Sequence, residues 1–317
     1  MQVSVIIPVY NAEKYVRQAV ESAIAQPETE EVLLIEDGSP DNALEICKQL
    51  EKEYSKVKLF HHKNGINKGA GASRNLGIRN AQCEFIAFLD ADDYYLENRF
   101  TIPKKLFDQD STIEGVYEAV GTCFQNEIAR MKWFSRRNYT LTTVKETVEP
   151  ELLFESLLSN KIGFFHTNGI IVRRLVFDKV GYFDVPLKMK QDSAMWLKMS
   201  AVCKLVPGRL TKPVAIRRVH EENRILSVSK EKEAYYQALL WKTLSDWGLK
   251  SKLPPAKLNL LLERYLGNLL GQGLTKTKLL SRKITQIKLL SDAVFKNPSL
   301  LKYQYFWHCF GLVIGLK

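Results

Sequence analysis

Residues 85–93 read Phe-Ile-Ala-Phe-Leu-Asp-Ala-Asp-Asp, an apolar run that ends abruptly in three carboxylates. A short run rich in Phe and Ile is typical of a strand buried on both faces of a sheet. Carboxylates at the carboxyl end of such a strand lie where open α/β sheets bind ligands. If the chain stays extended, Asp90 and Asp92 point to the same side, and two hard oxygen ligands suit Mg²⁺ or Mn²⁺ carrying a diphosphate. The alternative is an acidic turn that caps the next helix.

The residues before this run alternate between strand-like and helical patterns. Strand-like apolar runs cover 3–9, 32–35 and 57–60, and helical spacing covers 12–26 and 40–54. A Gly-rich loop over 64–75 then leads into a helix that ends near Asn80. Strands that alternate with helices imply parallel pairing through right-handed crossovers. Polar residues follow three of the four strands, so the sequence predicts an α/β fold with one ligand site above the strand ends.

Four motifs within the first hundred residues occur in a recognisable order. They are Val3-Ser-Val-Ile-Ile-Pro-Val-Tyr-Asn-Ala-Glu-Lys-Tyr-Val16, Glu36-Asp-Gly-Ser39, Asn67-Lys-Gly with Ala72-Ser-Arg-Asn75, and Phe88-Leu-Asp-Ala-Asp-Asp93. This set resembles family 2 glycosyltransferases, which implies a GT-A type, Rossmann-like mixed sheet. A weaker continuation is Gly181-Tyr-Phe-Asp184 followed by 191–198, where Gln191 and Met195 replace the Glu and Leu that are usual in the family.

The resemblance implies a metal-dependent inverting transfer of a sugar from a nucleoside-diphosphate sugar, with UDP as the expected nucleotide, to an acceptor hydroxyl. Mn²⁺ or Mg²⁺ would offset the charge of the leaving diphosphate as a Lewis acid. Asp92 is the expected metal ligand, and His220, after the strand-like run 214–219, completes the metal shell or contacts the diphosphate. Asp192 is the expected general base. It is also a candidate N-cap for a helix over 193–201, and the two roles are compatible.

The resemblance also implies a donor-binding set around the strand ends. Tyr10 could stack on the base, Asp37 could accept a hydrogen bond from it, and Asp90 would hold the ribose or share the metal through water. Lys68 and Arg74 lie near a helix N-terminus, which suits phosphate, although an ordinary basic surface loop remains the alternative. The full expected set is Pro8, Val9, Tyr10, Asn11, Glu13, Asp37, Gly38, Lys68, Gly69, Arg74, Asp90 and Ala91.

The C-terminal part differs in charge and periodicity. Residues 231–317 hold 14 Lys/Arg and 5 Asp/Glu, a net charge of +9 out of +11 for the whole chain. We therefore predict a catalytic, nucleotide-sugar-binding domain over 1–230 and a basic helical region over 231–317. A basic stretch from Lys276 to Lys288 and an aromatic end over 303–317 could meet an anionic membrane surface or a second copy in a homodimer. The alternative is a helical subdomain that packs on the catalytic domain.

Cysteine usage, apolar stretches and the motifs present limit the cellular location and the classes of partner. Five cysteines without a Cys-x-x-Cys pattern favour a reducing compartment. We see no signal peptide, no apolar stretch of about 18 residues and no nucleic-acid motif, so we expect a cytoplasmic protein, or a peripheral one on the inner face of the membrane.

The sequence leaves the acceptor and one alternative function open. The acceptor is a surface polysaccharide, a lipid-linked oligosaccharide, or a soluble protein or small molecule. Arg217 and Arg218 are candidates to contact phosphate or acidic acceptor groups. The main alternative is a non-catalytic or degenerate nucleotide-sugar-binding protein, which the Gln191 departure favours. A nucleotidyltransferase is disfavoured because the first strand is not followed by a Gly-rich loop with Arg and Lys.

Overall fold

A seven-stranded mixed sheet forms the centre of the first of two units, Met1–Val228. Its strand order is β10-β6-β9-β4-β1-β2-β3. The computed structural model describes the chain except for residues 222, 224–227, 274–278 and 315–317. β9 runs antiparallel to both β4 and β6, and the other pairs are parallel, which confirms the mixed α/β sheet. The strands are β1 Val3–Val9, β2 Thr29–Glu36, β3 Val57–His61, β4 Phe85–Phe88, β6 Gly115–Tyr117, β9 Ile170–Arg173 and β10 Leu205–Pro207.

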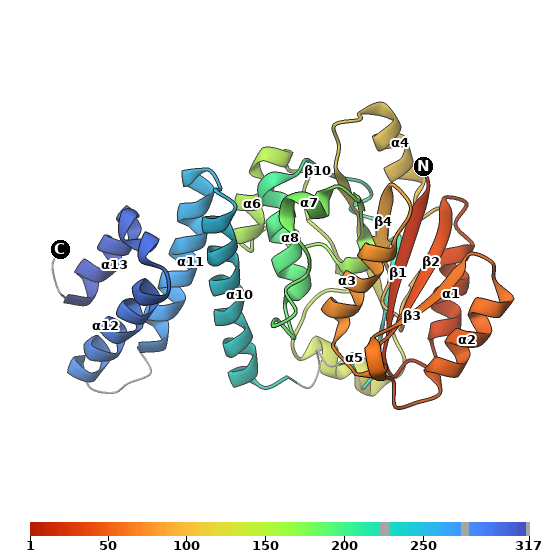
Figure 1. Ribbon diagram of the computed structural model, residues 1–317, viewed down its shortest axis with the longest axis horizontal. Coiled ribbons are helices and arrows are strands. Elements are labelled where there is room, and N and C mark those ends of the chain that lie inside the picture. The colour runs from red at the N-terminus through yellow and green to blue at the C-terminus, as the bar shows by residue number, and fades with distance from the viewer. Residues whose placement is uncertain (222, 224–227, 274–278, 315–317) are drawn as a thin grey trace. The chain divides into compact units, whose positions relative to one another are not determined.

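Helices cover both faces of β1, which explains why its sequence is apolar except for the buried Ser4. Figure 1 shows β1 between β4 and β2, with α3 (Ala70–Asn80) crossing the sheet. Val5 belongs to a core cluster that includes buried residues of α1 (Val16–Ile24) and α2 (Ala43–Glu53). Ile6 points to the opposite face, toward α3. Its side chain lies so close to Gly77 of α3 that a Cβ at that glycine would collide with it. Both faces of the strand are therefore dry.

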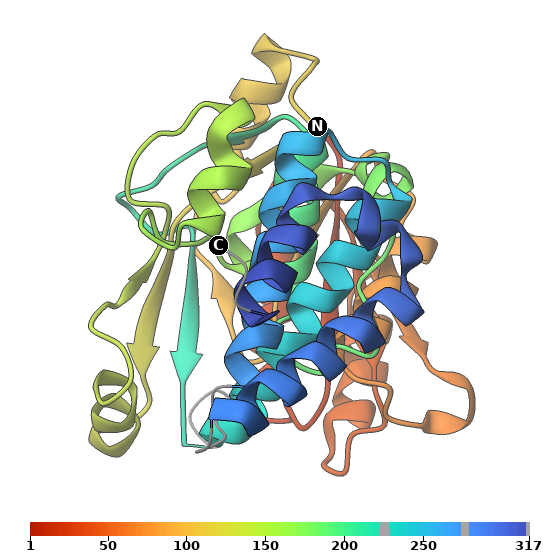
Figure 2. The ribbon, with the colours of Figure 1, turned by 90° about the vertical axis from the view of Figure 1, so that its left-hand side faces the viewer.

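A smaller four-stranded sheet continues the first unit in the order β5-β11-β7-β8. Figure 2 shows β7 and β11 side by side, and they pair in parallel. The strands are β5 Tyr94–Tyr95, β7 Val120–Phe124, β8 Leu141–Thr142 and β11 Ala215–Val219. β5 starts directly after Asp93 and pairs with β11. This pairing brings the end of β11, and with it His220, next to the aspartates that follow β4.

The remaining helices of the first unit frame the other half of the large sheet. The helix α8 is buried on most of its surface, and the fully buried indole of Trp196 contacts the rings of Phe88 and Phe183. This packing fixes the start of α8 relative to β4. The helices are α4 Thr101–Gln109, α5 Glu127–Phe134, α6 Pro150–Leu158, α7 Val176–Val180 and α8 Gln191–Val202, with 3-10 turns at Lys63–Gly65 and Thr167–Gly169.

The second unit, Ser229–Lys317, is helical. Its α11 buries Leu258, Leu261, Leu262, Tyr265 and Leu266, as the helical spacing predicts. In the described part of the chain no helix is both long and apolar enough to cross a bilayer. Lys276, Lys278 and residues 315–317 lie outside the described residues. The helices are α10 Lys230–Lys250, α11 Pro255–Gly273, α12 Leu279–Lys296 and α13 Gln304–Ile314, with a 3-10 turn at Pro298–Lys302.

Candidate active site

A polar cavity of about 540 Å³ opens where β1 and β4 end. Most of the predicted site residues line it together, although they come from five separate stretches of the chain. These lining residues are Pro8, Val9, Tyr10, Asn11, Asp37, Gly69, Arg74, Asp90, Ala91, Asp92 and His220. Tyr10 is 51% exposed, so its ring is free to stack on a ligand. Asn11 turns the chain sharply, with φ of 53°, and its amide donates to Ser39 Oγ.

The loop over 64–69 is held in place by Asp37. Both oxygens of this buried carboxylate accept backbone hydrogen bonds, from Lys68 at 2.7 Å and from Gly69 at 2.8 Å. His62 approaches the same carboxylate, with Nε2 3.5 Å from Oδ1. No motif of the sequence singles out His62, and nothing near it in the sequence signals this contact. A carboxylate has about four acceptor positions, so Asp37 keeps capacity for one more donor.

Gly38 and Lys68 contribute backbone and do not line the cavity. Gly38 has φ of +71°, a conformation that other residues rarely adopt. A Cβ at this position would also collide with the carbonyl oxygen of Gly65. Lys68 offers its amide to Asp37 and its carbonyl oxygen to Lys188 Nζ at 3.0 Å. The geometry therefore places both residues in the scaffold that shapes the loop.

Arg74 and Asp90 form an ion pair at the cavity wall, with 2.6 Å between Nη2 and Oδ1. Burial raises the pKa of Asp90, but the Arg74 guanidinium and His166 outweigh burial, so the net pKa lies below its ordinary value. The next residue of α3 anchors the helix. Asn75 exchanges two hydrogen bonds with the backbone of Phe183, donating at 2.9 Å and accepting at 2.8 Å. Asn75 thereby connects two motifs that lie 108 residues apart in the sequence.

The predicted extended geometry of Asp90 and Asp92 is wrong, and so is the alternative of a helix cap. β4 ends at Phe88, and residues 90–93 form a turn that is closed by a hydrogen bond from Asp93 N to Asp90 O at 3.0 Å. A strand, β5, follows the turn. The two carboxylates still line one cavity, but they meet different partners. Asp92 Oδ2 lies 3.3 Å from His220 Nε2 and 3.2 Å from Asn223 Nδ2.

The Asp92 carboxylate fits a divalent cation. Its side chain is 31% exposed at the cavity, and among the described residues it forms an ion pair only with His220. Carboxylate oxygen suits Mg²⁺ and Mn²⁺, and a neutral imidazole nitrogen is an acceptable further ligand for a transition metal. Nucleotide phosphates would have to complete such a shell. Asp92 and His220 are thus the residues that would hold the metal.

A second group of ligand types, formed by Asp90, Asp93 and His166, has donor atoms within 4.8 Å of one another. All three side chains already accept hydrogen bonds from protein donors. Asp93 accepts from Arg218 N at 2.7 Å and from Asn168 Nδ2 at 2.6 Å. His166 Nδ1 accepts from a backbone amide, so the proton of the neutral ring lies on Nε2 and leaves no free lone pair. We therefore assign this group to a polar network and not to a metal.

Asp93 is almost fully buried in that network, at 1% exposure. Burial, and then the charges of Asp92 and Asp90, raise its pKa well above the ordinary value. Arg218 supports the same turn from β11. Its Nη1 donates to Asp92 O at 2.8 Å, and its guanidinium stacks 4.6 Å from the centroid of the Tyr15 ring. Only the fold brings these groups together, because they come from three distant segments.

Asp192 lies in the first turn of α8, outside the lining of the cavity. The N-cap prediction is wrong: the cap is Lys190, in the left-handed conformation with φ of 61°. Burial, and then the charge of Arg217, lower the pKa of His166 to about 4, although the charges of Asp90 and Asp192 act to raise it. Asp192 and Asp90 thus act on the same imidazole. Gln191 is buried, and its Oε1 packs where a Cβ of Gly71 would be.

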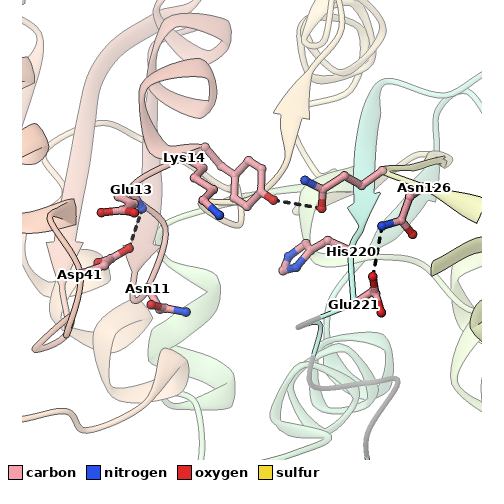
Figure 3. A pocket seen from close by; sticks show the side chains of 9 residues that line it. Asn11, Glu13, Lys14, Asp41, Asn126, His220 and Glu221 are labelled. Atoms are coloured by element: carbon pink, nitrogen blue, oxygen red, sulfur yellow. Dashed lines mark hydrogen bonds between the residues drawn. The ribbon is translucent and has the colours of Figure 1, made fainter. Parts of the chain in front are cut away.

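A second hollow of about 370 Å³ adjoins the first through Asn11 and His220. Figure 3 shows Glu13 and Asp41 on one side of it, with Asn126 and Glu221 across from them. Glu13 lines this hollow and not the main cavity. Its amide donates to Asp41 at 2.8 Å, and its carboxylate accepts from Asn42 N at 3.0 Å. Glu13 therefore ties the end of β1 to the start of α2.

Comparisons with known proteins agree with this fold. The model of the family described as Glycosyl transferase family 2 matches residues 4–181. An uncharacterized glycosyltransferase of Rickettsia felis is 30% identical over 240 residues, which cover 73% of this chain and 36% of that protein. The uncharacterized glycosyltransferase EpsJ of Bacillus subtilis is 26% identical over 197 residues, or 60% of this chain and 54% of that protein. The first relatives from Rickettsia are about three times the length that is matched.

Solved structures give the same assignment of the fold. The crystal structure of S. aureus TarS 1–349 in complex with UDP-GlcNAc superposes with a TM-score of 0.64 at 22% identity, and covers 92% of this chain and 80% of that one. The mixed sheet with C-terminal helices is therefore of the GT-A type. The chain belongs to glycosyltransferase family 2.

Proposed function

We propose that this protein transfers a sugar from a UDP-sugar to an acceptor hydroxyl, with inversion at the anomeric carbon. The observation that carries the proposal is the cavity at the ends of β1 and β4, where Arg74 meets Asp90 and Asp92 meets His220. TarS, a structural neighbour, has been crystallised with UDP and with UDP-GlcNAc. Ligand sites at the carboxyl ends of parallel strands are the rule in sheets of this kind.

The base and ribose would occupy the part of the cavity next to β1. Tyr10 offers an exposed ring, and Asp37 offers a carboxylate that the loop already orients. The diphosphate would lie nearer Arg74 and the start of α3. Backbone amides at a helix N-terminus and a guanidinium both favour phosphate oxygens. Because Asp90 pairs with Arg74 through one oxygen, the other oxygen is available to a ribose hydroxyl.

Asp92 and His220 would hold Mn²⁺ or Mg²⁺ together with the diphosphate. A bound cation of this kind neutralises charge on the leaving group. Asn223 keeps the Asp92 carboxylate oriented, since its amide donates to Oδ2 at 3.2 Å. Its Oδ1 accepts from His220 N at 2.6 Å, so one asparagine positions both proposed ligands.

Asp192 would remove the proton from the acceptor hydroxyl. It belongs to the helix that Trp196 fixes against β4, so its position is rigid. Its charge acts on the same imidazole as that of Asp90, which supports a base near the proposed donor. A single displacement assisted by one base inverts the anomeric carbon. The Gln191 departure favours a purely binding function, but Asp92 and Asp192 are both present and partly exposed, which supports catalysis.

The proposed acceptor is a surface polysaccharide or a lipid-linked oligosaccharide at the inner face of the membrane. The second unit is strongly basic and exposes large apolar side chains, with Phe295 at 88% and Trp307 at 52% exposure. Exposed apolar groups beside lysines suit an anionic bilayer surface. The five cysteines are free, as a cytoplasmic location would require. A homodimer through the same apolar groups is the competing arrangement.

Asp192→Asn tests the proposed reaction. The variant should bind UDP as the parent does, whereas turnover of the UDP-sugar with acceptor should fall by about 10²–10⁴, the usual contribution of a general base. Asp178→Asn is the matched control, because Asp178 lies in the first turn of α7 and is exposed. Retained turnover in Asp192→Asn would eliminate Asp192 as the base, and equal losses in both variants would point to a structural effect.

A further inference from the structure

The buried indole of Trp133 carries two stacked arginines. The guanidinium carbon of Arg217 lies 4.3 Å from the ring centroid, and that of Arg137 lies 4.7 Å from it. The ring is fully buried, and its Nε1 donates to Tyr139 O at 2.7 Å, which fixes its orientation. Cation–π contacts of this length hold a guanidinium in place without neutralising its charge.

Neither guanidinium has an acidic partner among the described side chains. Arg217 donates through Nη2 to the hydroxyls of Thr122 and Thr142, both at 3.2 Å. Arg217 Nε and Arg137 Nη1 are buried without a hydrogen-bond acceptor in the described part of the structure. Arg74, by contrast, is paired with Asp90. Burial and the charge of Arg137 lower the pKa of Arg217, and Asp93 and Asp90 act on Arg217 without forming an ion pair with it. Two partly buried cations on one ring that lack ion pairs are costly unless an anion joins them.

Within the described residues, the hydrogen bonds of Arg217 go to Thr122 and Thr142, and none joins it to a proposed donor-binding group, although its charge reaches Asp90. Alternation along β11 directs neighbouring side chains to opposite faces of the sheet. Arg218 reaches the Asp92 carbonyl oxygen and Gln18 Oε1, on the side of the Asp90–Asp93 turn. Arg217 instead reaches Trp133. Its charge lowers the pKa of His166, the imidazole that Asp192 also influences. Arg217 therefore lies within electrostatic reach of the side on which the proposed base acts.

We propose that Arg217 and Arg137, held on Trp133, bind an oxyanion group of the acceptor, a phosphate ester or a carboxylate. This inference rests on the proposed function, because it assigns an acceptor subsite to the same active site. The planar fork of arginine suits both oxyanions. The enzyme would thus select an acidic acceptor, in which a charged group lies beside the hydroxyl that is glycosylated.

Binding of small probes by the full chain tests the subsite. The protein is first saturated with UDP and Mn²⁺, and UDP binding is measured by calorimetry. Glycerol 3-phosphate, glucuronate, glycerol and glucose are then titrated separately and followed by NMR. We expect one or both anionic probes to bind and the neutral probes to bind much more weakly. Comparing glycerol 3-phosphate with glucuronate shows whether the subsite prefers a phosphate or a carboxylate.

Arg217→Gln and Arg137→Gln should each weaken the anionic probe about tenfold, with UDP binding unchanged. Arg217→Lys keeps the charge but loses the planar fork of donors, so its affinity for the anionic probe should lie between those of the parent and of Arg217→Gln. The matched control is Arg130→Gln, because Arg130 also stacks on an aromatic ring, Phe134 at 6.0 Å, but is paired with Glu127. Arg137 follows α5 in a loop, so its variant keeps the test valid should Arg217→Gln fail to fold.

Three outcomes would overturn the proposal. The subsite is refuted if the anionic probes bind no better than the neutral ones. It is also refuted if the Arg217 and Arg137 variants bind the anionic probe as tightly as Arg130→Gln does. Displacement of the anionic probe by additional UDP would place it in the donor cavity. Failure of the parent protein to bind UDP would contradict the proposed function itself, and the calorimetric arm detects that failure separately.

Discussion

Replacing Asn75 by alanine should release α3 from the segment that precedes α8. The Asn75 side chain is buried at 4% exposure and satisfies both the N–H and the C=O of Phe183. Alanine cannot form either bond, and the two backbone groups would stay buried without partners. The same segment carries the Phe183 ring, which lies 5.6 Å from the Arg74 guanidinium. The loss should therefore affect the cavity wall as well as stability.

The expected magnitude follows from the two orphaned groups. A buried donor or acceptor left unsatisfied costs about 1–3 kcal/mol, so the pair gives about 2–6 kcal/mol. Relaxation that admits water lowers the cost, and we expect about 3 kcal/mol. Such a loss is a large share of the 5–15 kcal/mol that is typical of a folded domain.

Urea unfolding followed by circular dichroism measures the loss, and hydrogen exchange at the Phe183 amide locates it. Asn80→Ala is the matched control. Asn80 lies at the end of the same helix, is half-buried, and donates to Leu76 O at 2.8 Å. Its replacement should cost less than about 1 kcal/mol. If Asn75→Ala costs no more than Asn80→Ala, or the Phe183 amide keeps its protection, the two hydrogen bonds do not anchor the segment as described.

Three further predictions concern stability and surfaces. Burial raises the pKa of Glu31, but the hydrogen bonds from Lys58, Gln82 and Ser4 outweigh burial, so the net pKa lies below its ordinary value of 4.5. The ionised Glu31 therefore stabilises the fold above pH 4.5, and this stabilisation is lost as the pH falls through the folded-state pKa. Glu31→Gln should remove this part of the acid dependence, and unchanged acid unfolding would refute it. Gly38→Ala should destabilise the first unit by about 1 kcal/mol or more, because φ is +71° and a Cβ would collide with a backbone oxygen. A melting temperature that rises in this variant would contradict the prediction. Replacing both Phe295 and Trp307 by serine should weaken sedimentation with anionic liposomes at least about tenfold at an unchanged melting temperature, whereas equal sedimentation would favour a packing or dimer role.

The sequence was most informative where one residue type leaves few options. Apolar runs such as that of β1 had to be strands covered on both faces, and the structure covers them with α3 on one side and α1 and α2 on the other. Polar residues after those strands had to gather at one edge. The cavity lined by Tyr10, Arg74 and Asp92 follows directly from that topology.

The sequence was least informative where a short segment depends on distant partners. The turn over 90–93 is set by Asn168 and Arg218, which bond to Asp93 from separate loops and strands. No local pattern distinguishes this turn from an extended end of β4. His62 is similar, because its contact with Asp37 exists only once two strand ends are adjacent. Asp192 kept its place at the start of a helix, but Lys190 provides the cap because the chain there is left-handed.

Thermal stability with UDP, in the presence and absence of Mn²⁺, tests the central claim most directly. At 100 times its dissociation constant UDP should stabilise the fold by about 2.7 kcal/mol. We expect this shift to require Mn²⁺ in the parent chain and to disappear in Asp92→Ala. A metal-dependent shift that Asp92→Ala retains would remove Asp92 as the ligand. No shift with UDP, GDP, TDP or CDP under either condition would contradict a donor site at the ends of β1 and β4.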